Sequence, residues 1–341
     1  MTRFGRFPTA QESMRFTSAD VARFAEWSSD HNPLHVDPAF ARGTYFGKAI
    51  VHGMFSVIRA LEESGGATDA RHLDIEFRGA VAPDETYAVT SAEDGASRLV
   101  SVNGGDGLVL RISTTGASDD DLSRQLGTIA DWVPAVPRLE LRAAPVDRSL
   151  EGIAAIGQLV GRYRTSSPSL DGQGEGVLRN QVFALCSYVV GMDVPGLRSL
   201  FTRAELALDA GAPASDELLY RLTVRRVDAQ FRILDAQLEV ASSDGRIVAA
   251  CKLRSYVRFS PVVTDLDVIA AHVSGLGALE GRVALVSGGS RGLGADIAAA
   301  LALAGARVFV NYRRDAAGAT ALQACRSRAP GRTALNISTC C

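Results

Sequence analysis

Apolar and polar positions follow two different periods along the first part of the chain. Apolar residues recur at helical spacing over 17–28, after a capping-box-like start at Thr17 and Asp20, and again over 51–64. The second segment is apolar enough to be mostly buried. Strand-like alternation then begins at 73–78, and we predict further strands near 86–90, 97–103 and 108–115.

The same order of elements returns after residue 145. The spacing predicts a helix near 150–163 and a buried helix near 182–190. Four strands are expected to follow, near 199–208, 219–226, 231–241 and 246–258. We therefore predict an α+β architecture over residues 10–260, in which a long helix wrapped by an antiparallel sheet occurs twice.

A third pattern begins after a linker near 261–280. A short apolar strand at 281–286 runs into a glycine-rich stretch and an Ala-rich helix, and a strand at 307–312 completes one strand-helix-strand crossover. We expect only this first crossover of a partial α/β, Rossmann-type segment. The 341 residues thus suit three domains, with predicted bounds of 1–140, 146–262 and 281–341.

Composition narrows the possible partners. The 36 basic and 38 acidic residues nearly balance, so neither nucleic acid nor an acidic membrane surface is expected as a partner. No apolar run approaches the roughly 20 residues that cross a bilayer, and we expect a soluble, cytoplasmic protein. The five cysteines are scattered and suggest neither a disulfide framework nor a zinc site, so no metal is predicted.

Candidate chemistry lies directly after the first predicted helix. Asp30 and His35 stand five positions apart on a turn that contains Asn32 and Pro33. Taken singly, Asp30 could cap the turn and His35 could be an ordinary surface histidine. Held together on one rigid turn, a carboxylate and an imidazole can share a water molecule, which is what adding water to a double bond, or removing it, requires.

The residues from Asp30 to Ala41, together with Val51-His52-Gly53-Met54, resemble the signature of the MaoC-like, (R)-specific enoyl-thioester hydratases, which have a hot dog fold. Ser29 stands where that family usually has glycine. The resemblance implies a tandem, or double, hot dog fold and a hydro-lyase that interconverts 3-hydroxyacyl and trans-2-enoyl thioesters. Asp30 and His35 would be its catalytic residues, and an acyl-CoA or acyl carrier protein thioester its partner.

Three further residues are candidates for binding the substrate or the reacting oxygen. The N–H of Gly53, in the first turn of a buried helix, could stabilise an enolate oxygen, although Gly53 could also be small only for close packing. His52 is a lesser candidate, and Asn32 is expected to brace the turn rather than act on the substrate. In the second repeat, residues 161–168 hold neither Asp nor His. We therefore expect that repeat to be chemically empty and to serve as a pseudo-dimer partner.

The run from Ser287 to Gly294 resembles the T-G-x-x-x-G-x-G fingerprint of short-chain dehydrogenase/reductases, with Ser287 in place of Thr. Three glycines would let the backbone approach a pyrophosphate at the helix N-terminus; these are Gly288, Gly292 and Gly294. Arg313 and Arg314 after the next strand favour the 2'-phosphate of NADP. The family's Tyr-x-x-x-Lys is missing, since no Lys follows Lys252 and no Tyr follows Tyr312.

Three alternatives remain open at this point. A hot dog thioesterase would usually place its carboxylate on or beside the central helix, where only Glu62 and Glu63 occur, at the far end. The second alternative is the NADP-dependent 3-ketoacyl reductase of a longer fusion protein, of which residues 281–341 would be a truncated piece. The third is a non-catalytic acyl-binding module. The sequence also leaves open the choice of carrier, the acyl chain length and the physiological direction of the reaction. The pathway, in fatty acid or polyketide biosynthesis, and a possible homodimer are open as well.

Overall fold

The chain divides into two compact units, Met1–Arg258 and Phe259–Cys341. In this computed structural model the described residues are 11–65, 71–95, 97–115, 122–133, 140–167, 170, 176–209, 212–213, 215–259, 264–273, 277–313, 315–324 and 337–340.

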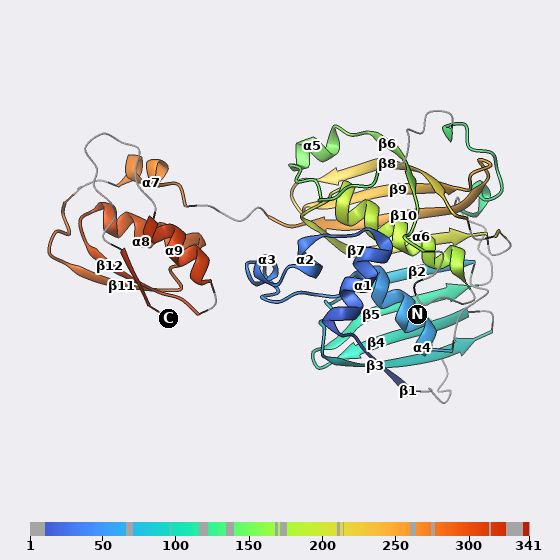
Figure 1. The fold of residues 1–341 in the computed structure, drawn as a ribbon, viewed down its shortest axis with the longest axis horizontal. Coiled ribbons are helices and arrows are strands. Elements are labelled where there is room, and N and C mark those ends of the chain that lie inside the picture. Colours follow the sequence, from blue (N-terminus) through green and yellow to red (C-terminus); the bar gives the residue numbers. More distant parts are fainter. Residues whose placement is uncertain are drawn as a thin grey trace. The chain divides into compact units, whose positions relative to one another are not determined.

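The larger unit is built on one ten-stranded antiparallel sheet (Figure 1). Its first half contains β1 (Gln11–Arg15), β2 (His72–Phe77), β3 (Thr86–Asp94), β4 (Ser97–Gly104) and β5 (Gly107–Thr115). Its second half contains β6 (Gln158–Tyr163), β7 (Ser199–Leu208), β8 (Leu218–Asp228), β9 (Ile233–Ala241) and β10 (Ile247–Val257). The order is β1-β3-β4-β5-β2-β7-β10-β9-β8-β6. The halves therefore join where β2 pairs with β7, with Ile75 opposite Ala204.

Each half contributes one long helix to the same face of this sheet (Figure 1). These helices are α4 (Gly53–Glu63) and α6 (Val177–Tyr188), which continues as a π-helical turn over Val189–Asp193. The two helices are in contact, and buried residues of both halves, such as Phe55 and Phe183, form one hydrophobic core. Burying both apolar helix faces in a shared core ties the halves together.

Shorter helices position the connecting segments. The helix α1 (Ser18–Ser28) opens with the predicted capping box between Thr17 and Asp20. It is followed by α2 (Pro33–Val36) and α3 (Pro38–Arg42), each with proline in its first turn, and a 3-10 turn lies at Ser123–Gln125. The first strand, β1, was not predicted, although it pairs with β3.

The predicted helix near 150–163 was wrong in its second part. The helix α5 covers only Leu150–Ala154, and residues 158–163 form strand β6. The helix cannot continue because Gly157 takes a φ of +63°. Gly161 then lies opposite Tyr220 in the sheet, where an added Cβ would approach that tyrosine ring to 2.5 Å. Apolar spacing that fits a helix here also fits a short strand.

The smaller unit contains a three-stranded parallel sheet, in the order β11-β12-β13. Its elements are α7 (Leu266–His272), β11 (Val283–Ser287), α8 (Gly292–Leu303), β12 (Arg307–Asn311), α9 (Ala316–Ala324) and β13 (Ile337–Cys340). The expectation of a single crossover was wrong, because β13 adds a second one. The described strand β13 is only four residues long, so its hydrophobic pattern is too short to be recognised.

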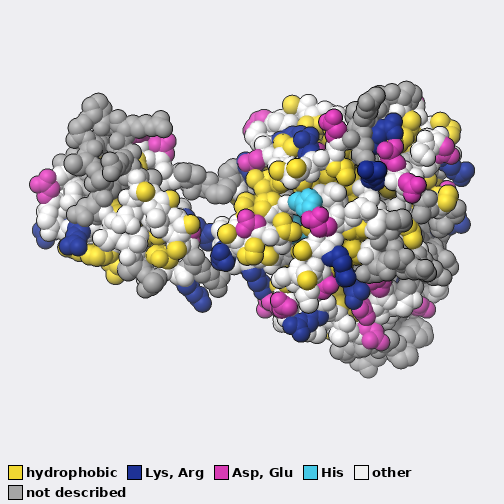
Figure 2. Space-filling view, viewed as in Figure 1, with side chains coloured by type: hydrophobic (Ala, Val, Ile, Leu, Met, Phe, Trp, Pro, Cys, Tyr) yellow, Lys and Arg dark blue, Asp and Glu magenta, His cyan; other side chains and the backbone are white. Residues whose placement is uncertain are grey.

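The surface charges and the helices of the described residues agree with the near balance of acidic and basic residues in the sequence. On the face drawn in Figure 2, acidic and basic side chains are intermingled, so no broad field of one sign lies there. No helix in the described ranges combines the length and the apolar character that a membrane span needs.

Candidate active site

Asp30 lies in a buried position directly after α1. Ser29 ends that helix in the left-handed region, at a φ of 56°, and so turns the chain inward. The Asp30 carboxylate is 2% exposed. Its Oδ2 accepts a hydrogen bond from Ser187 Oγ at 2.6 Å, and its Oδ1 accepts one from the backbone N–H of Asn32 at 3.2 Å. Burial, partly offset by these two bonds, raises the pKa of Asp30 to about 7.

His35 presents a free ring nitrogen to the same site. Its Nδ1 lies 2.8 Å from the carbonyl oxygen of Ile50. A carbonyl can only accept, so Nδ1 carries the proton and Nε2 keeps its lone pair. Burial lowers the pKa of His35 to about 4, with a smaller contribution from the positive charge of Arg258. At neutral pH the imidazole is therefore uncharged and can accept a proton at Nε2.

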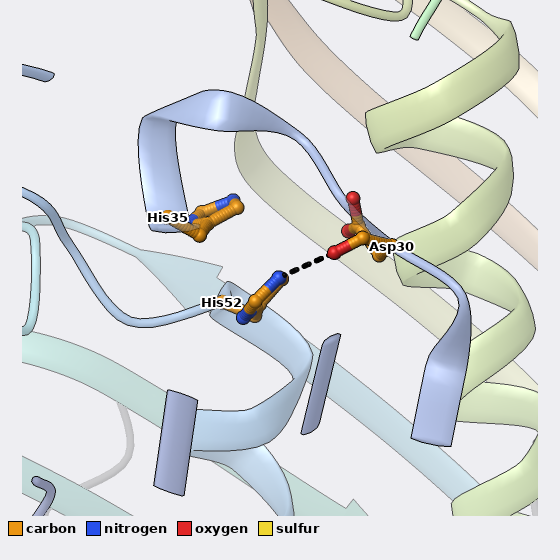
Figure 3. Close-up of side chains that lie close together, drawn as sticks. All are labelled: Asp30, His35 and His52. Atoms are coloured by element: carbon orange, nitrogen blue, oxygen red, sulfur yellow. Dashed lines mark hydrogen bonds between the residues drawn. The ribbon is translucent and has the colours of Figure 1, made fainter. Parts of the chain in front are cut away.

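His52 contacts both Asp30 and His35. This fully buried residue precedes α4, and its Nε2–H donates to the backbone oxygen of Asp30 at 2.9 Å. Its ring stacks on that of His35, with 3.9 Å between centroids, so the three residues converge as Figure 3 shows. Burial, and then the neighbouring charge of His35, lower the pKa of His52 well below its usual value. His52 does not line the cavity in front of Asp30 and His35, and its hydrogen bond and ring stacking orient these two neighbours.

The same three residues could in principle bind a metal ion. Within the described part of the chain, Asp30, His35 and His52 form a group in which each residue has one potential ligand atom, and these atoms lie within 4.8 Å of one another. Each imidazole, however, uses one ring nitrogen in a hydrogen bond to a backbone carbonyl, and the carboxylate accepts two hydrogen bonds. These bonds give each group a fixed orientation and a defined proton position. The arrangement therefore suits proton transfer to and from a small molecule.

Asn32 braces the turn against the second half of the sheet. Its side chain is fully buried, and its amide donates to the carbonyl oxygens of Gly191 at 2.9 Å and Gly196 at 3.2 Å. Its Oδ1 accepts from the backbone N–H of Leu34 at 3.1 Å. Asn32 does not line the cavity, so its polar atoms serve the architecture and not the substrate.

The second half of the unit contributes directly to the site, and the expectation that it is chemically empty was wrong. Ser187 of α6 supplies the hydroxyl that binds Asp30 Oδ2. Gly191 of the π-helical turn lies so close that an added Cβ would come within 2.4 Å of Asp30 Oδ1. Sequence reasoning missed both residues. The only signals were a serine and a glycine inside the otherwise apolar, buried stretch 182–192.

A cavity of about 800 Å³ opens in front of these groups and is lined by Asp30, His35, Gly53 and Ser187, among others. Gly53 is the first residue of α4, and the first N–H groups of a helix have no intrahelical acceptor. A Cβ at this position would come within 2.9 Å of the Phe77 ring. Close packing against Phe77 is therefore one reason for a glycine at position 53, in addition to the predicted role of its amide.

In the smaller unit, the glycine run forms a tight loop between β11 and α8. Gly288 and Gly292 adopt positive φ values of 71° and 55°, and a Cβ on Gly294 would lie 2.4 Å from the carbonyl oxygen of Gly288. The loop lies beside the end of β12, because the N–H of Gly288 donates to Asn311 O at 2.9 Å. Arg313 follows β12 and is exposed, whereas Arg314 lies outside the described residues.

Comparison with known proteins agrees with the geometry of the larger unit. Residues 2–113 match the family model described as the MaoC like domain. The matched residues make up about a third of the chain. Over 45 residues it is 60% identical to the (R)-specific enoyl-CoA hydratase of Aeromonas caviae, covering 13% of this chain and 34% of that protein. Over 89 residues it is 30% identical to 3-hydroxyacyl-thioester dehydratase X of Mycobacterium tuberculosis, covering 26% and 32%.

A solved structure described as a MaoC-like dehydratase is 16% identical, with a TM-score of 0.44, over 74% of this chain and 98% of that one. The chain spans about a third or less of the length of the curated relatives that it matches. The matched residues include Asp30, His35 and Gly53, whereas Ser187 and Gly191 lie outside them. The site is therefore completed by a part of the sequence that the family model does not cover.

Proposed function

We propose that this protein is a hydro-lyase that interconverts 3-hydroxyacyl and trans-2-enoyl thioesters. The observation that carries the proposal is that Asp30, His35 and the first residue of α4 line one cavity. Two halves, each with a long helix on five strands of a shared sheet, support the interpretation as a tandem hot dog fold. The names of the relatives support an acyl thioester substrate and, for the Aeromonas protein, the (R) configuration.

The protonation states divide the work between the two catalytic residues. Between pH values of about 4 and 7 the pair holds a single proton, which resides on Asp30, while His35 is neutral. In the hydration direction, His35 Nε2 then takes a proton from water as the water oxygen bonds to C3. The electrons of the C2–C3 double bond move onto the thioester carbonyl oxygen.

The resulting enolate is then protonated at C2. Asp30 gives its proton to C2, and the carbonyl double bond forms again. The proton on His35 returns to Asp30 through the next water molecule, which restores the starting state. Dehydration follows the same steps in reverse: the Asp30 carboxylate removes the C2 proton, and protonated His35 delivers a proton to the departing hydroxyl group.

The negative charge on the carbonyl oxygen needs a fixed donor. We assign this role to the backbone N–H of Gly53, which lies at the positive end of α4 and lines the cavity. One well-placed donor of this kind is worth about 3 kcal/mol in the transition state. Ser187 and His52 act as positioning residues, since they hold Asp30 through its carboxylate and its backbone.

The decisive experiment follows the loss of enoyl absorbance on addition of trans-2-enoyl thioesters of short and medium length. Asp30→Asn and His35→Ala should each lower kcat by at least about 100-fold. The matched control is His31→Ala, since His31 neighbours Asp30 but does not line the cavity. Unchanged turnover in both variants would show that the site is misassigned. An inactive parent protein would instead favour a non-catalytic acyl-binding module.

A hot dog thioesterase is less well supported. Its carboxylate would come from Glu62 or Glu63, but both lie at the C-terminal end of α4 and pair with Arg59, at 3.3 and 3.1 Å. Neither lines the cavity. Release of free thiol from an acyl-CoA, without any hydration of the enoyl substrate, would favour the thioesterase.

For the smaller unit we propose that the glycine loop binds NADP. The positive φ values of Gly288 and Gly292, and the close contact of Gly294 with Gly288, fit a loop that leaves room for a pyrophosphate at the start of α8. The arginine at 313 would bind the 2'-phosphate, and the bound cofactor would supply hydride chemistry to a complete reductase. Such a unit beside a dehydratase suits fatty acid or polyketide assembly, where ketoreduction precedes loss of water.

Nucleotide binding can be measured without any turnover. Titration with NADPH should give tighter binding than titration with NADH, and Arg313→Glu should remove this difference. Arg282→Glu, which changes an exposed arginine of the same unit, is the control. Equal and weak binding of the two nucleotides would contradict the assignment.

A further inference from the structure

The connection from α3 to α4 brings aromatic and basic side chains to the cavity mouth. No Asp or Glu occurs between residues 38 and 61, whereas Arg42, Tyr45, Phe46 and Lys48 follow one another closely. Tyr45, Phe46 and Lys48 all line the cavity that holds Asp30. A ligand that enters this cavity would therefore pass these three side chains.

Tyr45 is the most exposed of the large hydrophobic residues in the described ranges, at 98%. Its only described ring contact is with the neighbouring Phe46, edge to face, with 5.8 Å between centroids. A side chain so exposed adds little to folding, because burial is what makes an aromatic ring stabilising. At the entrance of a cavity, however, the same ring offers a free face on which a flat ligand group can stack.

Two cations accompany this ring at the cavity. Lys48 pairs with the Glu85 carboxylate, which also accepts a hydrogen bond from the Tyr87 hydroxyl at 2.9 Å. Arg78 is held by Glu76, with 2.9 Å between Nε and the carboxylate. The side chains of Lys48 and Arg78 remain about half exposed, at 56% and 50%. Each can therefore approach a phosphate group while its carboxylate partner fixes its position.

We propose that Tyr45 stacks on the adenine ring of coenzyme A, with Lys48 and Arg78 facing the phosphates, so that the substrate is an acyl-CoA. The inference rests on the proposed function, because the pantetheine arm must reach Asp30 and His35. Coenzyme A and a carrier protein present the same arm, and only coenzyme A adds a base and phosphates at its end. An exposed aromatic ring and two cations that line the same cavity match that addition.

The kinetic test compares crotonyl-CoA, crotonyl-pantetheine and a crotonyl carrier protein thioester. The wild type should use crotonyl-CoA with a kcat/KM at least about tenfold above that for crotonyl-pantetheine. Tyr45→Ala should lower this ratio about tenfold, mainly through KM for crotonyl-CoA, and Tyr45→Trp should restore it. Phe231→Ala is the matched control, because Phe231 is 65% exposed and does not line the cavity.

Calorimetric titration with free coenzyme A separates this inference from the proposed function. The wild type should bind coenzyme A about tenfold more tightly than Tyr45→Ala, whether or not any thioester is turned over. Equal binding by the two proteins, an unchanged ratio in the kinetic test, or a higher kcat/KM for the carrier protein thioester would overturn the inference. Failure of the proposed function alone would instead appear as no turnover of any thioester, with the difference in coenzyme A binding intact.

Discussion

The hydroxyl of Ser187 donates a hydrogen bond of 2.6 Å to Asp30 Oδ2, although 157 positions separate the two residues in the sequence. The bond connects α6 of the second half to the turn after α1 of the first. It stabilises the ionised form of Asp30 and opposes the effect of burial on its pKa. The second half therefore holds the carboxylate of the proposed acid in place and lowers the proton affinity that burial gives it.

Ser187→Ala should raise the pKa of Asp30 further, because it removes this hydrogen bond but keeps the carboxyl buried. We expect kcat to fall about tenfold, and the limb of the kcat/KM profile that reports Asp30 to move to higher pH. Ser255→Ala, which removes another buried serine hydroxyl away from the cavity, should leave the profile in place. A uniform loss of activity at all pH values would mean that Ser187 has only a structural role.

The pH profile of the wild type tests how the proton is shared. With a pKa of about 7 for Asp30 and about 4 for His35, the singly protonated pair predominates between these values. We expect kcat/KM to be highest there and to fall about tenfold per pH unit above about 7, as Asp30 loses its proton. If the Asp30 carboxylate alone were the base for hydration, kcat/KM would instead rise through pH 7.

Gly53→Ala separates the two explanations of this glycine. The added Cβ would lie within 2.9 Å of the Phe77 ring, so packing alone predicts a lower Tm and lower activity. The double variant Gly53→Ala with Phe77→Ala removes the clash and should recover Tm. If the position of the amide matters for the enolate, kcat should stay at least about tenfold below that of Phe77→Ala alone. Full recovery of kcat in the double variant would leave only the packing role.

The local part of this site could be predicted because short-range physics determines it. A helix that ends at Ser28, a turn built on Asn32 and Pro33, and a helix that begins at Gly53 are all encoded within a few residues of each position. The strands joined by tight turns were predicted for the same reason, since alternation and turn residues are local signals.

Long-range contacts account for most of what the sequence did not reveal. Ser187 and Gly191 matter because α6 packs against the turn after α1, and nothing near them in the sequence indicates that neighbour. The backbone bonds made by Asn32 and His52 likewise depend on partners brought together by folding. The residues 158–163 were misassigned because six residues with mixed spacing cannot distinguish a strand from the end of a helix.

The stability of Asp30→Asn, relative to the wild type, should depend on pH. Burial raises the pKa of Asp30 from an unfolded value near 3.9 to about 7, so between these pH values the folded state keeps a proton that the unfolded state releases. The contribution of Asp30 to stability therefore falls as the pH rises from about 4 to about 7. His35 acts in the opposite direction, because its pKa of about 4 lies below the unfolded value near 6.5, and its contribution rises over that range.

The Asp30→Asn substitution removes only the contribution of Asp30. The Tm of the variant minus that of the wild type should therefore increase between pH 5 and pH 8 in thermal unfolding. A difference that is constant over this range would show that Asp30 titrates alike in the folded and unfolded chains, and the assignment of a shared proton to the pair would have to be abandoned.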